Sequence, residues 1–154
     1  MIKILIPVDG SEQALLAVHH AIRLVEAGLK ARFLVANVQE GANLYEMVVA
    51  HDPAVLEKVS ADAAHEMMRS AVQRLQAAGV PVEQAVGSGD PAHVLVDIIE
   101  EQGCEAVIMC THGGGVRAAV MGSVSQAMVQ RSPVPVTLVR VPDDDDEAMA
   151  SEDE

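Results

Sequence analysis

Short apolar segments of strand length alternate along this chain with segments whose apolar residues recur at helical spacing, and this alternation restricts the fold most strongly. The predicted helices cover residues 11–26, 53–78, 91–101 and 123–131. The predicted strands cover residues 2–8, 32–38, 82–86, 106–110 and 136–141. Strands separated by helices pair in parallel through right-handed crossovers. The sequence therefore predicts an α/β fold with an open, doubly wound, five-stranded parallel sheet and helices on both faces.

Residues that favour helix ends mark the boundaries of these predicted helices. Ser11 is predicted to cap the first helix. Asp52 and Asp90 are each followed by a proline, which combines an N-cap with the residue favoured at the first helical position. Segment 82–86 alternates polar and apolar residues, as a partly exposed edge strand would. Three glycines stand where helices are expected to stop: Gly28, Gly79 and Gly103.

Length and composition indicate one soluble domain. A chain of 154 residues fits a single sizeable core, and Phe33 and Tyr45 are its only aromatic residues, so that core must be aliphatic. No apolar run approaches the roughly 20 residues of a transmembrane helix. The chain enters a strand pattern at once, without the features of a signal peptide. We expect a cytoplasmic protein with no membrane insertion.

The net charge of −13 is concentrated at the end of the chain. Residues 143–154 carry eight acids and no base, which leaves −5 for residues 1–142. A block of like charges repels itself and has little to bury, so we predict a folded domain over 1–142 and a disordered acidic tail over 143–154. The tail could simply solvate the protein or serve as a partner site. An acidic domain argues against nucleic-acid binding, which needs a basic surface.

Cysteine and histidine patterns give little support to a metal or redox site. Cys104 and Cys110 are expected to flank one strand, too far apart for a disulfide, and they form no C-x-x-C motif. His65 and Glu66 resemble the start of a zinc-protease helix, but Arg69 stands where the second histidine is required. The sequence predicts no metal site. Most of the six histidines are expected at or near the surface.

A glycine-rich turn follows the fourth predicted strand. Thr-His-Gly-Gly-Gly occupies residues 111–115, and Gly122 and Ser123 then open a helix. Glycine lets the backbone approach an anion closely, and the free N–H groups of a helix's first turn favour negative charge. This pattern predicts an anion-binding loop, although an empty strand-to-helix loop remains the alternative. It is not the usual phosphate loop, because no Gly-Lys-Ser/Thr follows.

A second loop is expected to meet the glycine-rich turn. Ligands of such sheets bind beyond the carboxyl ends of the strands, where the strand order reverses. If the first and fourth strands are neighbours there, residues 7–11 lie beside the glycine-rich turn. The glycine amides would then bind phosphates, and Asp9 or nearby backbone would bind a base or a sugar hydroxyl. Alternatively, Asp9 only tightens the first strand-to-helix turn.

Four motifs in order resemble the universal stress protein family. They are Ile-Pro-Val-Asp-Gly-Ser at 6–11, Thr-His-Gly at 111–113, Gly-Ser-Val-Ser at 122–125 and Arg-Ser-Pro-Val-Pro-Val at 131–136. The likeness covers about residues 1–141. It implies the strand order 3-2-1-4-5, a homodimer formed by antiparallel pairing of the fifth strands, and non-enzymatic stress or signalling roles in the cytoplasm. One branch of the family binds ATP and another binds no nucleotide.

The resemblance also implies a nucleotide site for ATP or AMP, with or without Mg. Its phosphate side would be Gly113, Gly122, Ser123, Val124 and Ser125, and its adenine side Pro7, Val8, Asp9 and Val38. This chain departs from the binding branch in two ways. Cys110 replaces the first glycine of that branch's motif, and eight residues rather than nine separate Gly113 from Gly122. The run of three glycines could restore a nest of N–H groups.

Two functions therefore remain open. The first is a regulatory protein that binds ATP or AMP. The second is a nucleotide-free dimeric module that binds a still unknown protein partner. No nucleophile stands with a base and an orienting group, so no enzyme is expected, although slow ATP hydrolysis at the loop is conceivable. The apolar strand at 136–141 is predicted to be an edge that a second copy of the chain covers. Val134, Val136 and Leu138 would lie at or near that interface.

Overall fold

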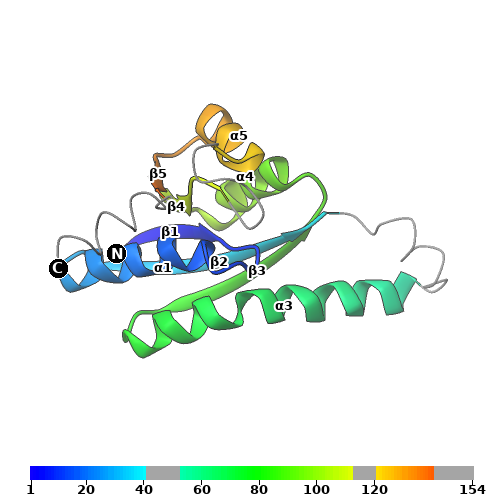
Figure 1. Ribbon diagram of the computed structural model, residues 1–154, viewed down its shortest axis with the longest axis horizontal. Coiled ribbons are helices and arrows are strands. Elements are labelled where there is room, and N and C mark those ends of the chain that lie inside the picture. Colours follow the sequence, from blue (N-terminus) through cyan, green and yellow to red (C-terminus); the bar gives the residue numbers. More distant parts are fainter. Residues whose placement is uncertain (41–52, 113–120, 141–154) are drawn as a thin grey trace, which may run out of the picture.

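The structure is a computed structural model that describes residues 1–40, 53–112 and 121–140. Its strands and helices alternate along the chain as the apolar pattern predicts (Figure 1). The strands are β1 (Ile2–Pro7), β2 (Ala31–Gln39), β3 (Val82–Ser88), β4 (Ala106–Cys110) and β5 (Val136–Val139). The helices are α1 (Ala14–Glu26), α3 (Pro53–Ala77), α4 (Pro91–Gln102) and α5 (Ser123–Arg131).

The five strands form one sheet in the order β3-β2-β1-β4-β5. Every pair of neighbouring strands is parallel, which confirms the predicted fold class and strand order. The chain winds outward from β1 to β2 and β3, and then returns to place β4 on the other side of β1. The strand order therefore reverses between β1 and β4, and the carboxyl ends of these two strands border the switch point.

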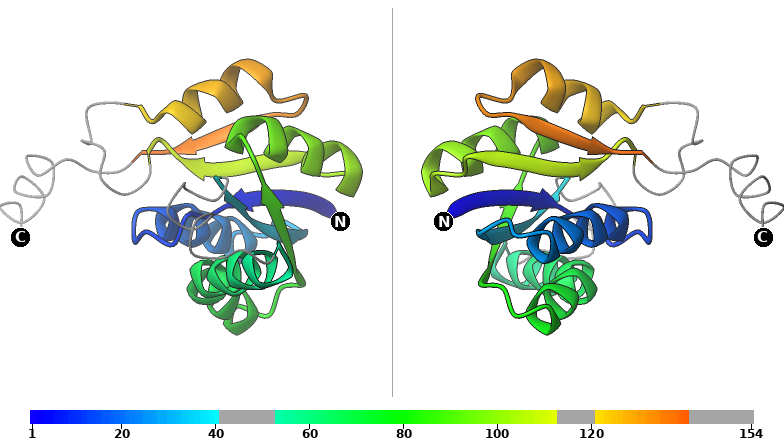
Figure 2. Two further views of the ribbon diagram at one scale, coloured as in Figure 1. Left: turned by 90° about the vertical axis from the view of Figure 1, so that its right-hand side faces the viewer. Right: turned by 90° about the vertical axis from the view of Figure 1, so that its left-hand side faces the viewer.

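Helices cover both faces of the sheet, with α1 and α3 on one side and α4 and α5 on the other (Figure 2). Neighbouring residues of β1 point to opposite faces: Ile4 and Ile6 pack in the core under α1 and α3, whereas Leu5 packs under α4 and α5. All three side chains are buried. Burial on both sides explains why the central strands are continuous apolar runs.

Two predicted helix ends are confirmed at α4. The Asp90 carboxylate accepts a hydrogen bond from the His93 N–H at 3.1 Å, and Pro91 occupies the first helical position. At the other end Gly103 adopts the left-handed conformation, with φ +67°. Asp52, the corresponding cap predicted for α3, lies outside the described residues.

With Ser11 as its cap, the first helix was predicted to begin at residue 12, which is two residues too early. Helix α1 begins at Ala14, because residues 11–13 form a tighter turn in front of it. The Asp9 carboxylate accepts the backbone N–H of Ser11 at 3.0 Å and also the Ser11 hydroxyl. The Ser11 Oγ in turn accepts the N–H of Ala14 at 3.3 Å, so it still serves as an acceptor for the start of the helix.

Four strands differ from their predicted bounds, and only β3 and β5 differ by as much as two residues at one end. Strand β3 continues to Ser88 because it remains paired with β2 as far as Gln39. Gly87 makes this possible, since a Cβ there would lie 2.3 Å from Cγ1 of Val94. The open pattern of β3 confirms the predicted edge strand, since four of its seven residues are exposed. Strand β5 is shorter than predicted and ends at Val139, opposite the last residue of β4.

Other expectations have mixed outcomes. Both cysteines are free, as predicted. Among the described residues, no group of three or more His, Cys, Asp or Glu side chains is arranged to hold a metal ion. Within the same part of the chain, no helix is long and apolar enough to cross a membrane. Gly113 and the acidic tail over 143–154 lie outside the described residues, so the predictions made for them stay predictions.

Candidate functional site

A cleft of about 260 Å³ lies beyond the carboxyl ends of β1, β2 and β4. This volume is close to the lower end of typical small-molecule sites, about 300–1,000 Å³. Eight of the nine residues expected to bind a nucleotide line the cleft: Pro7, Val8, Asp9, Val38, Gly122, Ser123, Val124 and Ser125. The ninth, Gly113, lies outside the described residues. The structure therefore brings the first strand-to-helix loop to the same cleft as His112 and Gly122, the described residues on either side of the glycine-rich segment.

The start of α5 forms one wall of the cleft. Gly122 is the N-cap residue, with extended backbone angles and no side chain to cap the helix. The N–H of Gly122 donates to the Thr111 carbonyl at 2.8 Å, which fixes the helix start beside the end of β4. Among the described residues, no acceptor pairs with the N–H groups of Ser123, Val124 or Ser125. Within the described part of the chain, three amides of the first turn are therefore without an acceptor, as in helix starts that bind anions.

Gly122 has a structural role that the motif alone does not reveal. A Cβ at this position would lie 3.2 Å from the His112 Cα and 3.6 Å from the Thr111 carbonyl oxygen. A side chain at this position would therefore crowd the backbone of residues 111 and 112 and push it by a few tenths of an ångström. A substitution of Gly122 would disturb the helix start itself and could not isolate binding.

Ser125 holds the helix start against the sheet. Its side chain is 2 % exposed, and its hydroxyl donates to the Cys110 carbonyl at 2.9 Å. The hydroxyl is thus engaged with the protein, whereas the backbone N–H of Ser125 belongs to the open first turn. Ser123, by contrast, is exposed.

Cys110 forms part of the cleft wall at the end of β4. Its buried thiol donates to the Gln13 carbonyl at 2.7 Å, so the sulfur is held toward the start of α1. Burial raises the pKa of the Cys110 thiol, and the negative charge of Asp9 acts in the same direction. The thiol is therefore a neutral side chain near neutral pH.

Asp9 lies at the exposed rim of the cleft, directly after β1. Its Oδ1 accepts both the N–H and the hydroxyl of Ser11. Asp9 therefore tightens the first strand-to-helix turn, as the second of the two interpretations of its sequence position predicted. No hydrogen bond within the described residues engages its Oδ2. One oxygen of the carboxylate thus supports the turn, and the other has no hydrogen-bond partner in the described part of the chain.

His112 is the second residue of the glycine-rich turn, and its side chain is buried, with 3 % of its surface exposed. Its Nδ1 lies 3.1 Å from the Thr111 hydroxyl, and the residue lines the cleft. Within the described residues no carboxylate pairs with this imidazole. The pair therefore lacks the orienting group that nucleophilic catalysis requires.

The structure adds lining residues that were not predicted from the motifs. They come from the ends of neighbouring strands and the starts of neighbouring helices: Ala14, Ala36, Glu40, Pro91, Leu95 and Met109. For two of them, Pro91 and Glu40, the sequence contained a pattern from which their place at the cleft could have been predicted. Pro91 follows a strong cap residue, which places a helix start at the carboxyl edge of the sheet. Glu40 follows the second predicted strand, and the same edge rule applies to it.

A family model described as the universal stress protein family matches residues 1–140. Two relatives are similar over most of their length. The universal stress protein MJ0531 of Methanocaldococcus jannaschii is 23% identical over 141 residues, covering 91% of this chain and 82% of the relative. The universal stress protein YxiE of Bacillus subtilis is 25% identical over 146 residues, covering 90% of this chain and 98% of the relative.

Solved structures have the same fold. The MJ0577 protein superimposes with a TM-score of 0.76 at 24% identity, covering 92% of this chain and 97% of that one. A universal stress protein in complex with cAMP has a TM-score of 0.68 at 22% identity, covering 92% and 98%. A family member from Arabidopsis thaliana with AMP bound has a TM-score of 0.67 at 15% identity, covering 94% and 95%.

Proposed function

This chain belongs to the universal stress protein family, and we propose that it is a cytoplasmic regulatory protein that binds an adenine nucleotide, ATP or AMP, in the cleft between β1 and β4. The observation that carries the proposal is the open first turn of α5, which faces this cleft at the switch point of the sheet. Two proteins of the same fold have cAMP or AMP bound, which supports an adenine ligand.

The cleft divides into two sides with different chemistry. The free amides of Ser123, Val124 and Ser125 would bind a phosphate group. Apolar side chains on the other side would pack against the faces of adenine, and Asp9 would accept a ribose hydroxyl. The apolar set is Pro7, Val8, Ala36, Val38 and Leu95. This division explains why the sequence combines a polar turn with apolar strand ends in one place.

We propose no catalytic role for the cleft. The Thr111 hydroxyl and the His112 imidazole are neighbours, but Thr111 is not among the residues that line the cleft. An occupied or empty cleft would instead be the state that a partner protein senses.

We also propose a homodimer through β5. Strand β5 is an edge of the sheet, and its residues Val136, Leu138 and Val139 are only half-buried in a single chain. The carbonyls of Pro135 and Val139 accept hydrogen bonds from the N–H groups of Val107 in β4 and of Thr111 just after it. Because backbone groups alternate in direction along a strand, those of Val136 and Leu138 face the open edge. An antiparallel pair of β5 strands would satisfy these groups and cover the apolar edge.

Thermal melting with added nucleotide tests the proposed binding. A ligand at about 100 times its Kd adds about 2.7 kcal/mol to the free energy of unfolding. For a chain of this length, that gain raises Tm by roughly 5–10 °C. GTP provides a control for recognition of the base. Unchanged melting at millimolar ATP, ADP and AMP would contradict the proposal and favour the nucleotide-free interaction module.

A further inference from the structure

Three helix starts meet at the cleft, and at two of them fewer amides are left for an anion. The first is α1, whose first residue Ala14 lines the cleft. The Ala14 N–H donates to Ser11 Oγ at 3.3 Å, and the next two amides donate to the carbonyls of Glu12 and Gln13 at 3.1 and 3.0 Å. The amides at the start of α1 are therefore satisfied within the protein.

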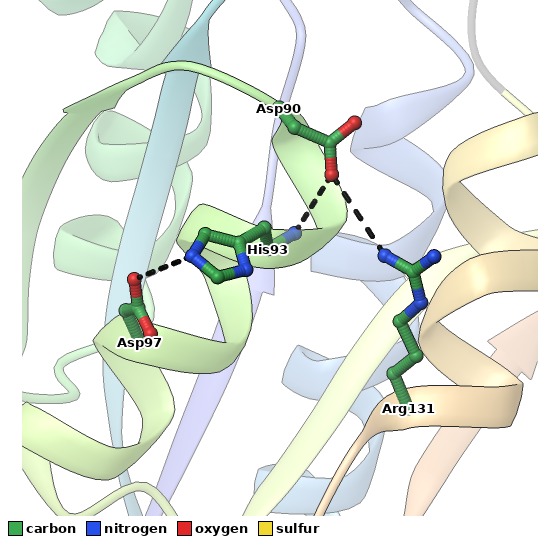
Figure 3. A network of polar contacts seen from close by, with 4 residues as sticks. All are labelled: Asp90, His93, Asp97 and Arg131. Carbon is green, nitrogen blue, oxygen red and sulfur yellow. Dashed lines mark hydrogen bonds and ion pairs between the residues drawn. The ribbon is translucent and has the colours of Figure 1, made fainter.

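The second is α4, which reaches the cleft through Pro91. Proline has no N–H to donate, and the Asp90 carboxylate accepts the N–H of His93 at 3.1 Å (Figure 3). Asp90 also lies 4.0 Å from the Arg131 guanidinium, at the far end of α5. The start of α4 thus carries its own negative charge, and Arg131 is engaged with it rather than with the cleft.

Among the described residues, the start of α5 has the most amides without an acceptor, and it supplies little positive charge. Three amides and a dipole equivalent to about half an elementary charge suffice for one phosphate group. Among the described lining residues there is no lysine or arginine, whereas Asp9 and Glu40 are both acidic. The charge of Asp9 already reaches the cleft wall, where it helps to raise the pKa of the Cys110 thiol.

We propose that the cleft selects adenine ligands with a single phosphate group over ATP, and that Glu40 is the residue that sets this preference. The inference rests on the proposed function and specifies its ligand class. Each further phosphate adds negative charge to a cleft whose described lining includes two carboxylates and no lysine or arginine. Glu40 is exposed at the cleft, directly beyond β2, so its carboxylate adds to the negative charge there.

Titration calorimetry of the full chain with adenosine, AMP, ADP and ATP in EDTA tests the preference. We expect AMP to bind at least tenfold more tightly than ATP, because several unfavourable charge pairs accumulate. Raising the salt concentration should narrow this ratio, since salt screens such repulsion. Equal or tighter binding of ATP in EDTA would overturn the proposal.

Replacing Glu40 measures how much its charge alone contributes to the preference for a single phosphate group. Glu40→Gln should improve ATP affinity roughly two- to tenfold while leaving neutral adenosine within twofold, because only the repulsion changes. Glu26→Gln is the matched control, since Glu26 is an exposed carboxylate at the opposite end of α1. If Glu40→Gln leaves the ratio of ATP affinity to AMP affinity unchanged, Glu40 does not set the preference.

Arg117 provides the sharpest opposing test. It lies outside the described residues and is the basic residue nearest in sequence to the α5 start. If Arg117→Ala lowers ATP affinity tenfold more than AMP affinity, a basic group serves the polyphosphate and the proposal is wrong. If none of the four adenine compounds binds, the proposed function itself fails. If all bind but ATP binds best, only the preference fails.

Discussion

Replacing Ser123 with proline removes one hydrogen-bond donor from the cleft without an obvious cost to the fold. Ser123 is exposed and is the first residue of α5, where the N–H has no acceptor among the described residues. Proline is favoured at this position, because its fixed φ suits the helix and its missing N–H is not needed there. The preceding residue must be extended, and Gly122 has φ −67° and ψ 158°.

The expected effects on binding and on stability have opposite signs. A hydrogen bond to a charged group contributes about 1.5–3 kcal/mol, so Ser123→Pro should weaken AMP binding roughly 10- to 150-fold. The free energy of unfolding should stay the same or rise by about 0.4–1 kcal/mol, because proline restricts the unfolded chain. A loss of affinity therefore could not be attributed to a less stable protein.

Titration calorimetry and thermal melting of the same preparations measure the two effects. Ser123→Ala is the matched variant, because it removes the hydroxyl but keeps the N–H, and we expect its AMP affinity to stay within about twofold of the parent. If Ser123→Pro binds AMP as well as Ser123→Ala does, the backbone amides of α5 do not hold the phosphate. If Ser123→Ala loses as much affinity as Ser123→Pro, the hydroxyl rather than the N–H is the ligand-binding group.

Three further outcomes are expected. Thr137→Lys should yield a monomer in light scattering, because a charge on the exposed face of β5 opposes edge pairing. If Thr137→Lys forms as large a fraction of dimer as the control variant Gln102→Lys, the result argues against the β5 interface. In a Cys104→Ser background, alkylation of Cys110 should be slow near neutral pH, accelerate only at alkaline pH as the thiolate forms, and slow further with AMP; rapid alkylation unaffected by AMP would refute this. Deleting residues 143–154 should leave melting and AMP affinity nearly unchanged but lower solubility, whereas several-fold tighter binding would reveal an autoinhibitory tail.

Most of the fold could be predicted because its signals are local. The continuous apolar runs of the central strands follow from burial on both faces, and the Asp-Pro pair at residues 90–91 marked the start of α4. The start of α1 was misplaced because the capping residue is not adjacent to the helix. Asp9 first binds Ser11, and the resulting turn delays the helix to Ala14. Such a chain of hydrogen bonds, from Ser11 to Asp9 and from Ala14 to Ser11, cannot be predicted from residue types alone.

The motif residues of the cleft could be predicted, but their individual roles could not. Gly122 and Ser125 fit a phosphate site by sequence, yet Gly122 packs against the His112 backbone and the Ser125 hydroxyl holds the Cys110 carbonyl. Leu95 was not expected, since it comes from a helix whose position relative to the cleft depends on tertiary packing. Roles that depend on distances between segments far apart in sequence require the folded structure.

Binding of AMP to the full chain, measured by titration calorimetry at two temperatures, tests the central claim most directly. Two temperatures are needed because the heat of binding can vanish at one of them, whereas burial of apolar surface makes it temperature-dependent. We expect saturable binding of one AMP per chain, with a heat that becomes more negative on warming. No saturable heat at either temperature with millimolar AMP would show that the cleft between β1 and β4 is not a nucleotide site.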